Sequence, residues 1–189
     1  SLERLKSAGS ILFLLPGPKM IWQFGEIGYD ISIDYNGRLG RKPIKWNYLN
    51  ELNRKNIYNT WSYLIGLRKK HSIFSDPQSK IDTWLNNSIK KIQYSLGKEN
   101  AILITNFDVK TLQTSVTLPS AGHWYHATLG EKIYIEDNEL DVSIPAGTFL
   151  LMTDFEIDYL PKGQAKLSVE EIIMPKSLTL HSNYPNPFN

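Results

Sequence analysis

Two groups of side chains have types and spacings that could bind a metal ion. Asp30, Asp34 and Asn36 offer oxygen ligands at a spacing that resembles a calcium loop, but no glutamate follows where a hand-type loop requires one. His123 and His126 could bind zinc, but residues three apart on a strand point to opposite faces. We therefore expect neither group to form a metal site.

Aromatic residues in the second half of the chain could bind a sugar. Trp84, Trp124 and Tyr125 could form an exposed platform, because flat aromatic rings stack well on sugar rings. The alternative is that Trp124 or Tyr125 fills the core of a β-rich domain, where aromatic side chains contribute a large buried area. Both interpretations remain open from the sequence.

Composition excludes several other functions. With 189 residues, of which 41% are hydrophobic, the chain can bury a core. The formal net charge is only +2, so nucleic acid is not an expected partner. The chain contains no cysteine, which removes disulfides, thiolate zinc sites and cysteine nucleophiles. The longest apolar stretch, residues 11–15, is too short to span a membrane.

In the first 74 residues, two segments with apolar residues at helical spacing flank a short apolar run. Apolar residues at helical spacing over 2–15 predict a helix that Pro16 and Pro18 end. Residues 19–24 predict a strand buried on both faces, and 29–51 a structured loop. A second helix is predicted over 53–70, where the basic residues at 68–70 suit the helix dipole and are otherwise solvated charge.

After residue 74 the chain changes to short β-type runs separated by turn residues. Regular spacing of this kind predicts an antiparallel β-sandwich. The predicted strands lie at 89–96, 101–107, 112–118, 124–129, 132–135 and 140–152, the last interrupted at 145–147. From about residue 155 this rhythm is lost, which indicates a linker.

Two segments of the first half resemble glycoside hydrolase family 13. Residues 14–30 resemble the end of its (β/α)₈ barrel, where a Pro-Gly turn leads into the eighth strand and a Gly-x-Glu-x-Gly-like loop. Residues 41–46 resemble the Lys-Pro-x-x-Trp segment before the last barrel helix of bacterial α-amylases, and 63–70 resemble that helix. The resemblance implies an α/β plus all-β chain: a helix-strand-helix piece of the barrel over 1–74, the domain C sandwich over 75–154, and a linker with the start of another domain over 155–189.

The resemblance also implies a function for the parent protein. Enzymes of this type hydrolyse α-1,4-glucans such as starch by a retaining mechanism, and calcium is possible in the parent. Their catalytic carboxylates lie on earlier barrel strands, so no position here matches them and we expect this chain alone to be inactive. Its partners would be the missing N-terminal part of the barrel and, through the parent, the glucan. The alternative is a non-catalytic carbohydrate-binding or structural β-sandwich module.

Glu26 is a candidate for contact with a substrate. It lies just beyond the C-terminal end of the strand predicted at 19–24, the face on which barrel enzymes assemble their sites. Glu26 could therefore approach bound sugar or brace an active-site loop. Alternatively it accepts hydrogen bonds from loop backbone amides, with Gly25 and Gly28 supplying unusual backbone angles.

The last residues suggest where the parent protein works. The run Asn-Tyr-Pro-Asn-Pro-Phe-Asn at 183–189 resembles the opening of the sorting domain used by the type IX secretion system. A complete sorting domain would continue for several strands, so we expect the chain to be cut short there. The N-terminus has no signal-peptide pattern, so either the protein is cytoplasmic or its true start lies upstream. The tail favours an exported bacterial protein, secreted or at the cell surface.

Overall fold

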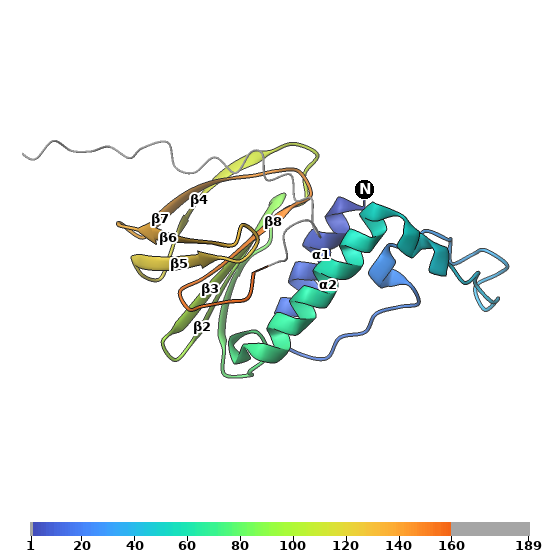
Figure 1. The fold of residues 1–189 in the computed structure, drawn as a ribbon, viewed down its shortest axis with the longest axis horizontal. Coiled ribbons are helices and arrows are strands. Elements are labelled where there is room, and N and C mark those ends of the chain that lie inside the picture. The colour runs from blue at the N-terminus through green and yellow to red at the C-terminus, as the bar shows by residue number, and fades with distance from the viewer. Residues whose placement is uncertain (1, 160–189) are drawn as a thin grey trace, which may run out of the picture.

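The computed structural model describes residues 2–159, which form three layers (Figure 1). Helices α1 (Glu3–Leu14) and α2 (Leu52–Lys70) lie against one face of a six-stranded sheet, and a two-stranded sheet covers the other face. Short 3-10 helices occur at η1 (Gly25–Ile27), η2 (Trp46–Asn50) and η3 (Ser72–Phe74). Both helices predicted from the apolar spacing are confirmed.

The two helices run side by side in the same direction. The Trp61 indole of α2 donates a 2.8 Å hydrogen bond to the Leu5 carbonyl near the start of α1. Two turns further along, Arg68 donates a 3.1 Å bond to the Phe13 carbonyl near the end of α1. Parallel neighbours require the chain to return between them, and residues 15–51 make that return crossing.

Within the crossing, the strand predicted at 19–24 does not form. No regular secondary structure occurs from 18 to 22, and a turn follows at 23–24. Met20 and Trp22 are 79% and 66% exposed, whereas the prediction required burial on both faces. A strand needs neighbours that bond its backbone and cover its faces, and none lies beside this segment among the described residues.

The remaining described chain forms eight strands in two sheets. The strands are β1 (Lys80–Trp84), β2 (Ile89–Leu96), β3 (Glu99–Asn106), β4 (Leu112–Thr117), β5 (Gly122–His126), β6 (Glu131–Ile135), β7 (Glu139–Ile144) and β8 (Phe149–Thr153). The larger sheet has the order β1-β2-β3-β8-β5-β6, the smaller pairs β4 with β7, and every pairing is antiparallel. The predicted strands are confirmed, except that β1, an edge strand with mostly exposed side chains, was not predicted.

Strands β3 and β8 are central because both of their faces are covered. On β3, Ala101 and Leu103 face the helices, whereas Ile102 and Ile104 face the two-stranded sheet. β8 alternates in the same way, and all five of its residues are buried. This double burial explains why both strands are nearly continuous apolar runs rather than alternating ones.

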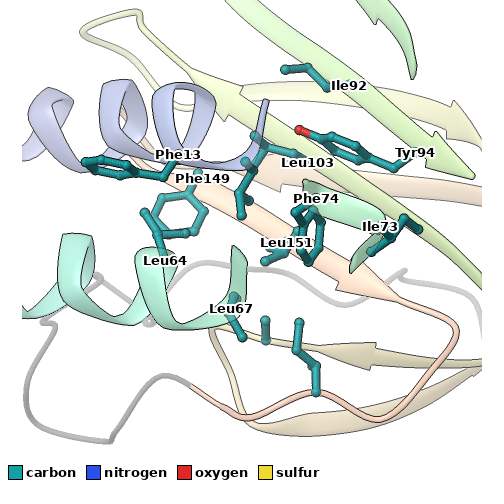
Figure 2. Close-up of a cluster of buried hydrophobic side chains, with 14 of the residues drawn as sticks. Phe13, Leu64, Leu67, Ile73, Phe74, Ile92, Tyr94, Leu103, Phe149 and Leu151 are labelled. Carbon is teal, nitrogen blue, oxygen red and sulfur yellow. The ribbon is translucent and has the colours of Figure 1, made fainter. Parts of the chain in front are cut away.

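The core beneath the helices joins the first half of the chain to the second. Figure 2 shows Phe13, Leu64 and Leu67 from the helices packed with Phe149 and Leu151 of β8, together with side chains from β2, β3 and η3. The Phe74 and Tyr94 rings meet edge to face at 5.4 Å. The predicted boundary at residue 74 therefore passes through a shared core.

Two further points concern the tail motif and membrane-spanning helices. The tail motif at 183–189 lies outside the described residues. Within residues 2–159, no helix has the length and apolar character needed to cross a membrane.

Gly9 should be required for the close approach of the two helices. A Cβ atom at this position would lie 2.2 Å from the Trp61 indole nitrogen, so we expect Gly9→Ala to lower the free energy of unfolding by about 2–3 kcal/mol. Urea denaturation would measure the change. Gly66 is the matched control, because an added Cβ meets nothing within 4 Å there and alanine should stabilise α2 by up to about 1 kcal/mol. Equal stabilities of the two variants would contradict the packing argument.

Candidate functional site

Within the crossing, residues 22–29 form a loop that turns tightly around Phe24. Phe24 has the left-handed backbone conformation, with φ of 56°, and the Gly25 amide bonds to the Trp22 carbonyl at 2.8 Å. Gly28 is also left-handed, and a Cβ there would lie 2.8 Å from the Leu2 side chain. The expectation of unusual backbone angles thus holds for Gly28, but Phe24 rather than Gly25 adopts the other one.

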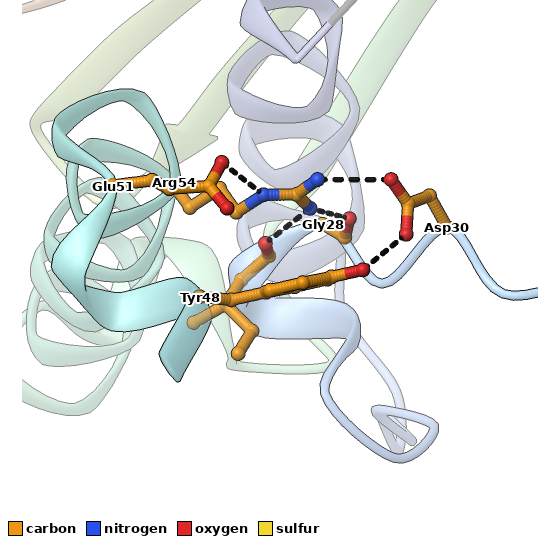
Figure 3. Close-up of polar contacts among 6 residues, drawn as sticks. Gly28, Asp30, Tyr48, Glu51 and Arg54 are labelled. Carbon is orange, nitrogen blue, oxygen red and sulfur yellow. Dashed lines mark hydrogen bonds and ion pairs between the residues drawn. The ribbon is translucent and has the colours of Figure 1, made fainter. Parts of the chain in front are cut away.

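Arg54 of α2 holds this loop in place (Figure 3). Its guanidinium donates to the backbone carbonyls of Ile27 and Gly28, and it pairs with Asp30 at 2.9 Å and with Glu51 at 2.8 Å. The arginine side chain is 9% exposed, so these oxygens replace the water that it loses. The planar guanidinium has enough donors to bind all four groups at once.

Tyr48 completes the same network. Its hydroxyl donates a 2.6 Å hydrogen bond to the Asp30 carboxylate, and its ring lies 3.8 Å from the Arg54 guanidinium carbon. The pKa of Asp30 is lowered because Tyr48 and then Arg54 donate hydrogen bonds to the charged carboxylate. Asp30 is therefore a structural anion rather than a proton donor at neutral pH.

Glu26 lies in η1 and is half-buried. Among the described residues, none donates a hydrogen bond to its carboxylate, so the alternative, in which loop backbone amides bond to Glu26, is not observed. Contact between Glu26 and a sugar stays a prediction.

Exposed apolar side chains surround this anchored loop. Trp22 and Trp46 are 66% and 64% exposed, and Met20 and Ile44 are similarly uncovered. Phe24, in contrast, is buried with Ile27 and Tyr48, and its ring meets Trp46 edge to face at 4.7 Å. The Arg54 network therefore holds a loop beside which four large apolar side chains are exposed.

The oxygen groups considered for calcium have other partners. Asp30 binds Arg54 and Tyr48, and Asp34 forms an exposed 3.2 Å pair with Arg38. Asn36 occupies a turn with φ of 55°. Within residues 2–159 there is no cluster of three or more acidic or histidine side chains that could hold a metal ion.

The two histidines considered for zinc lie on opposite faces of β5. His123 is exposed against the Tyr134 ring, whereas His126 is 4% exposed. The His126 Nδ1 contacts the Thr128 hydroxyl and the Leu129 amide, and its Nε2 has no partner among the described residues. Burial lowers the pKa of His126 to about 4, so this ring is neutral at pH 7.

The three aromatic residues proposed as a sugar platform are not brought together. Trp124 is fully buried in the core between the two sheets, and its indole donates to the Ser120 carbonyl, so the platform role was wrong for this residue. Tyr125 is half-buried on the opposite face of β5, under the Lys132 ammonium. Trp84 is exposed on β1, four strand positions away from β5.

Arg68 has a role that the sequence analysis missed. Rather than being solvated charge, its guanidinium donates to the carbonyls of Phe13, Leu15, Gly17 and Phe74. Arg54, Trp61 and Arg68 are spaced by seven residues, so they share one face of α2. That spacing was visible in the sequence, but the carbonyls that these side chains bind were not.

No family model matches this sequence, and no curated protein matches it. Solved structures do match it in fold. An α-amylase from Anoxybacillus matches with a TM-score of 0.58 and 18% identity, over 80% of this chain and 32% of that one. An α-amylase from H. orenii matches with a TM-score of 0.56 and 19% identity, over 81% and 36%. The described chain has the fold of the C-terminal region of α-amylases.

Two further solved structures also match the chain in fold. The structure of AmyP in complex with maltose matches with a TM-score of 0.64 and 15% identity, over 80% of this chain and 34% of AmyP. CldA, a cyclomaltodextrin glucanotransferase, matches with a TM-score of 0.60 and 12% identity, over 83% and 33%. The chain thus spans about a third of the length of these solved structures.

The Arg54 network should not tolerate lysine. Arg54→Lys keeps the charge but cannot bind two carbonyls and two carboxylates together, so we expect a loss of about 2 kcal/mol in the free energy of unfolding. Urea denaturation would measure it. The matched control is Arg38→Lys, whose ion pair is exposed and should matter by less than about 0.5 kcal/mol. A tolerated lysine at 54 would show that the loop is not anchored in this way.

His126 should make stability fall with acid. Its folded pKa is about 4 against 6.5 for a free ring, so the unfolded chain binds a proton first as pH falls. The resulting loss should begin near pH 6.5 and reach about 3 kcal/mol at pH 4. Urea denaturation of the wild type and His126→Asn between pH 7 and pH 4 would test this. Asparagine keeps an acceptor near Nδ1 but does not titrate, so parallel pH profiles would contradict the prediction.

Proposed function

We propose that this chain is the C-terminal part of an α-amylase-type glycoside hydrolase that cleaves starch-like α-1,4-glucans with retention. The observation that carries the proposal is the uncovered return crossing between two parallel helices. Its side chains Met20 and Trp22 are largely exposed, and no strand lies beside it among the described residues. In a (β/α)₈ barrel, this position is occupied by a strand that the neighbouring strands cover.

The length of the matched structures supports the same proposal. The chain spans about a third of each, so the rest of such a protein is long enough to supply the other barrel units. Structures of matched proteins were determined with maltose and with acarbose. These ligands support an oligosaccharide as the partner of the parent protein.

Catalysis would come from outside this chain. Retaining cleavage needs two carboxyl groups about 5–5.5 Å apart, one as nucleophile and one as acid/base. Near the anchored loop, Asp30 and Glu51 are paired with Arg54, and Asp34 is paired with Arg38. In this proposal the chain is a scaffold: α2 fixes the loop at the rim of the substrate cleft, and the sandwich supports the two helices.

A second candidate is a non-catalytic carbohydrate-binding or structural β-sandwich module. Trp84 favours a binding role because it is exposed on the sandwich, whereas Trp124 gives no support. Burial of residues 19–24 in the whole protein separates the two candidates, since a separate module would leave Trp22 exposed as it is in this chain.

We also propose that the parent protein is exported. The support is the sequence motif at 183–189, which lies outside the described residues. Fractionation of the producing cells would check this, and protein confined to the cytoplasm would contradict it.

The exposed crossing should be buried in the whole protein. The isolated 189-residue chain should release no reducing sugar from starch, whereas the whole protein should. In the whole protein, Trp22→Glu would bury a charge and should cost about 3 kcal/mol or more, with loss of starch cleavage. Thermal unfolding and a reducing-sugar assay would measure both effects.

Tyr134→Glu is the matched control for this experiment. Tyr134 is as exposed as Trp22, at 63%, but it lies on the edge strand β6 of the sandwich. The stability and the activity of the Tyr134→Glu variant should both stay near those of the wild type. Equal behaviour of the two variants would contradict the covering of residues 19–24 by a barrel.

A further inference from the structure

A groove of about 890 Å³ runs between the two sheets of the sandwich. It exists because the two-stranded sheet is narrower than the sheet it covers. β4 and β7 pack over β3, β8 and β5, while most of β2 and all of β1 extend beyond them. The inner face of β1 and β2 is therefore open to solvent, and its volume is within the roughly 300–1,000 Å³ of typical ligand sites.

Two side chains of β2 reach across this groove and bind the backbone of β4. Lys91 donates a 2.6 Å hydrogen bond to the Ser115 carbonyl of β4, and Gln93 donates a 2.6 Å bond to the Thr117 carbonyl. These carbonyls belong to the edge of β4 that no strand pairs with in the described chain. Since side chains already bind them, β4 is a poor template for an added peptide strand.

The lining of the groove suits a neutral ligand with many hydroxyl groups. Nine of its fourteen residues carry an amide or a hydroxyl group, among them Asn86, Asn87 and Gln93, although the hydroxyls of Ser115 and Thr117 already bond to Asp141 and Glu139 of β7. Amide side chains both donate and accept hydrogen bonds, as sugar hydroxyls require. The one ionisable lining residue is Lys91, and its ammonium is directed to Ser115. An anionic ligand would therefore find little charge to bind.

Trp84 provides an aromatic surface beside these polar groups. Its side chain is 51% exposed, and it stands opposite Lys91 in the pairing of β1 with β2. The turn that follows carries Asn86 and Asn87, so an indole and two amides lie at the same end of the groove. An aromatic ring next to amides is the combination that binds the flat apolar face and the hydroxyl rim of a sugar.

We propose that this groove binds a linear α-glucan chain, with Trp84 stacking on a glucose ring and Gln93, Asn86 and Asn87 bonding to its hydroxyls. A neutral oligosaccharide follows from the lining of the groove, and the α linkage rests on the proposed function. The site would bind the glucan at a distance from the catalytic carboxylates, which the proposed function assigns to the rest of the parent protein. It would tether the enzyme to a long polysaccharide while the barrel cleaves it.

Titration of the full 189-residue chain with maltoheptaose, followed by NMR, tests the proposal. Resonances of residues around 84–93 and 112–117 should shift, and Trp84→Ala should weaken binding at least about tenfold through the loss of the stacking surface. Trp84→Phe should restore most of the affinity because it retains an aromatic face. Tyr134→Ala removes an equally exposed aromatic residue from β6 and should leave the affinity unchanged.

Several results would overturn the proposal. These are no shifts with maltoheptaose, affinity unchanged by Trp84→Ala, and equal affinity for cellohexaose, whose linkages are β. An extended peptide that binds the groove when maltoheptaose does not would assign the groove to β-strand addition.

The same variant separates this site from the proposed function. In the whole protein, Trp84→Ala should reduce adsorption to starch granules but leave cleavage of a short soluble maltooligosaccharide unchanged. A whole protein that cleaves neither substrate would contradict the proposed function, yet the maltoheptaose titration would still report on the groove.

Discussion

One face of helix α2 binds backbone carbonyls, most of which no regular secondary structure satisfies. Arg54 bonds to the loop at Ile27 and Gly28, and Trp61 bonds to α1. Arg68 donates hydrogen bonds to four carbonyls at the place where α1, the crossing and the start of the sandwich meet. Buried polar backbone groups that lack partners are costly. Donors from one rigid helix can therefore hold an irregular segment in a single position, and the anchored loop and the exposed crossing both depend on this arrangement.

Elements whose signals are local could be predicted from the sequence. The apolar spacing of α1 and α2 gave their bounds to within a residue or so, because each helix buries one face and meets a breaker or a polar turn at its ends. The runs that form β3 and β8 were recognisable as strands since most of their residues are β-branched or apolar. Strand β1 was missed because an exposed edge strand shows little apolar alternation.

Features that depend on distant parts of the chain could not be predicted in the same way. Residues 19–24 have the composition of a buried strand, but composition does not supply the neighbours that would bury it. The position of Trp124 in the core follows from strand register, and the groove beside Trp84 follows from the unequal widths of two sheets. The carbonyls that Arg68 binds could not be inferred, because three of the four belong to residues more than fifty positions earlier in the chain.

The core beneath the helices also limits how the sandwich could move between proteins during evolution. Phe13, Leu64 and Phe74 cover the face of the sheet formed by β2, β3 and β8, so a chain that began at residue 75 would expose a broad apolar surface. A smaller chain that kept the sandwich stable would therefore have to include both α1 and α2.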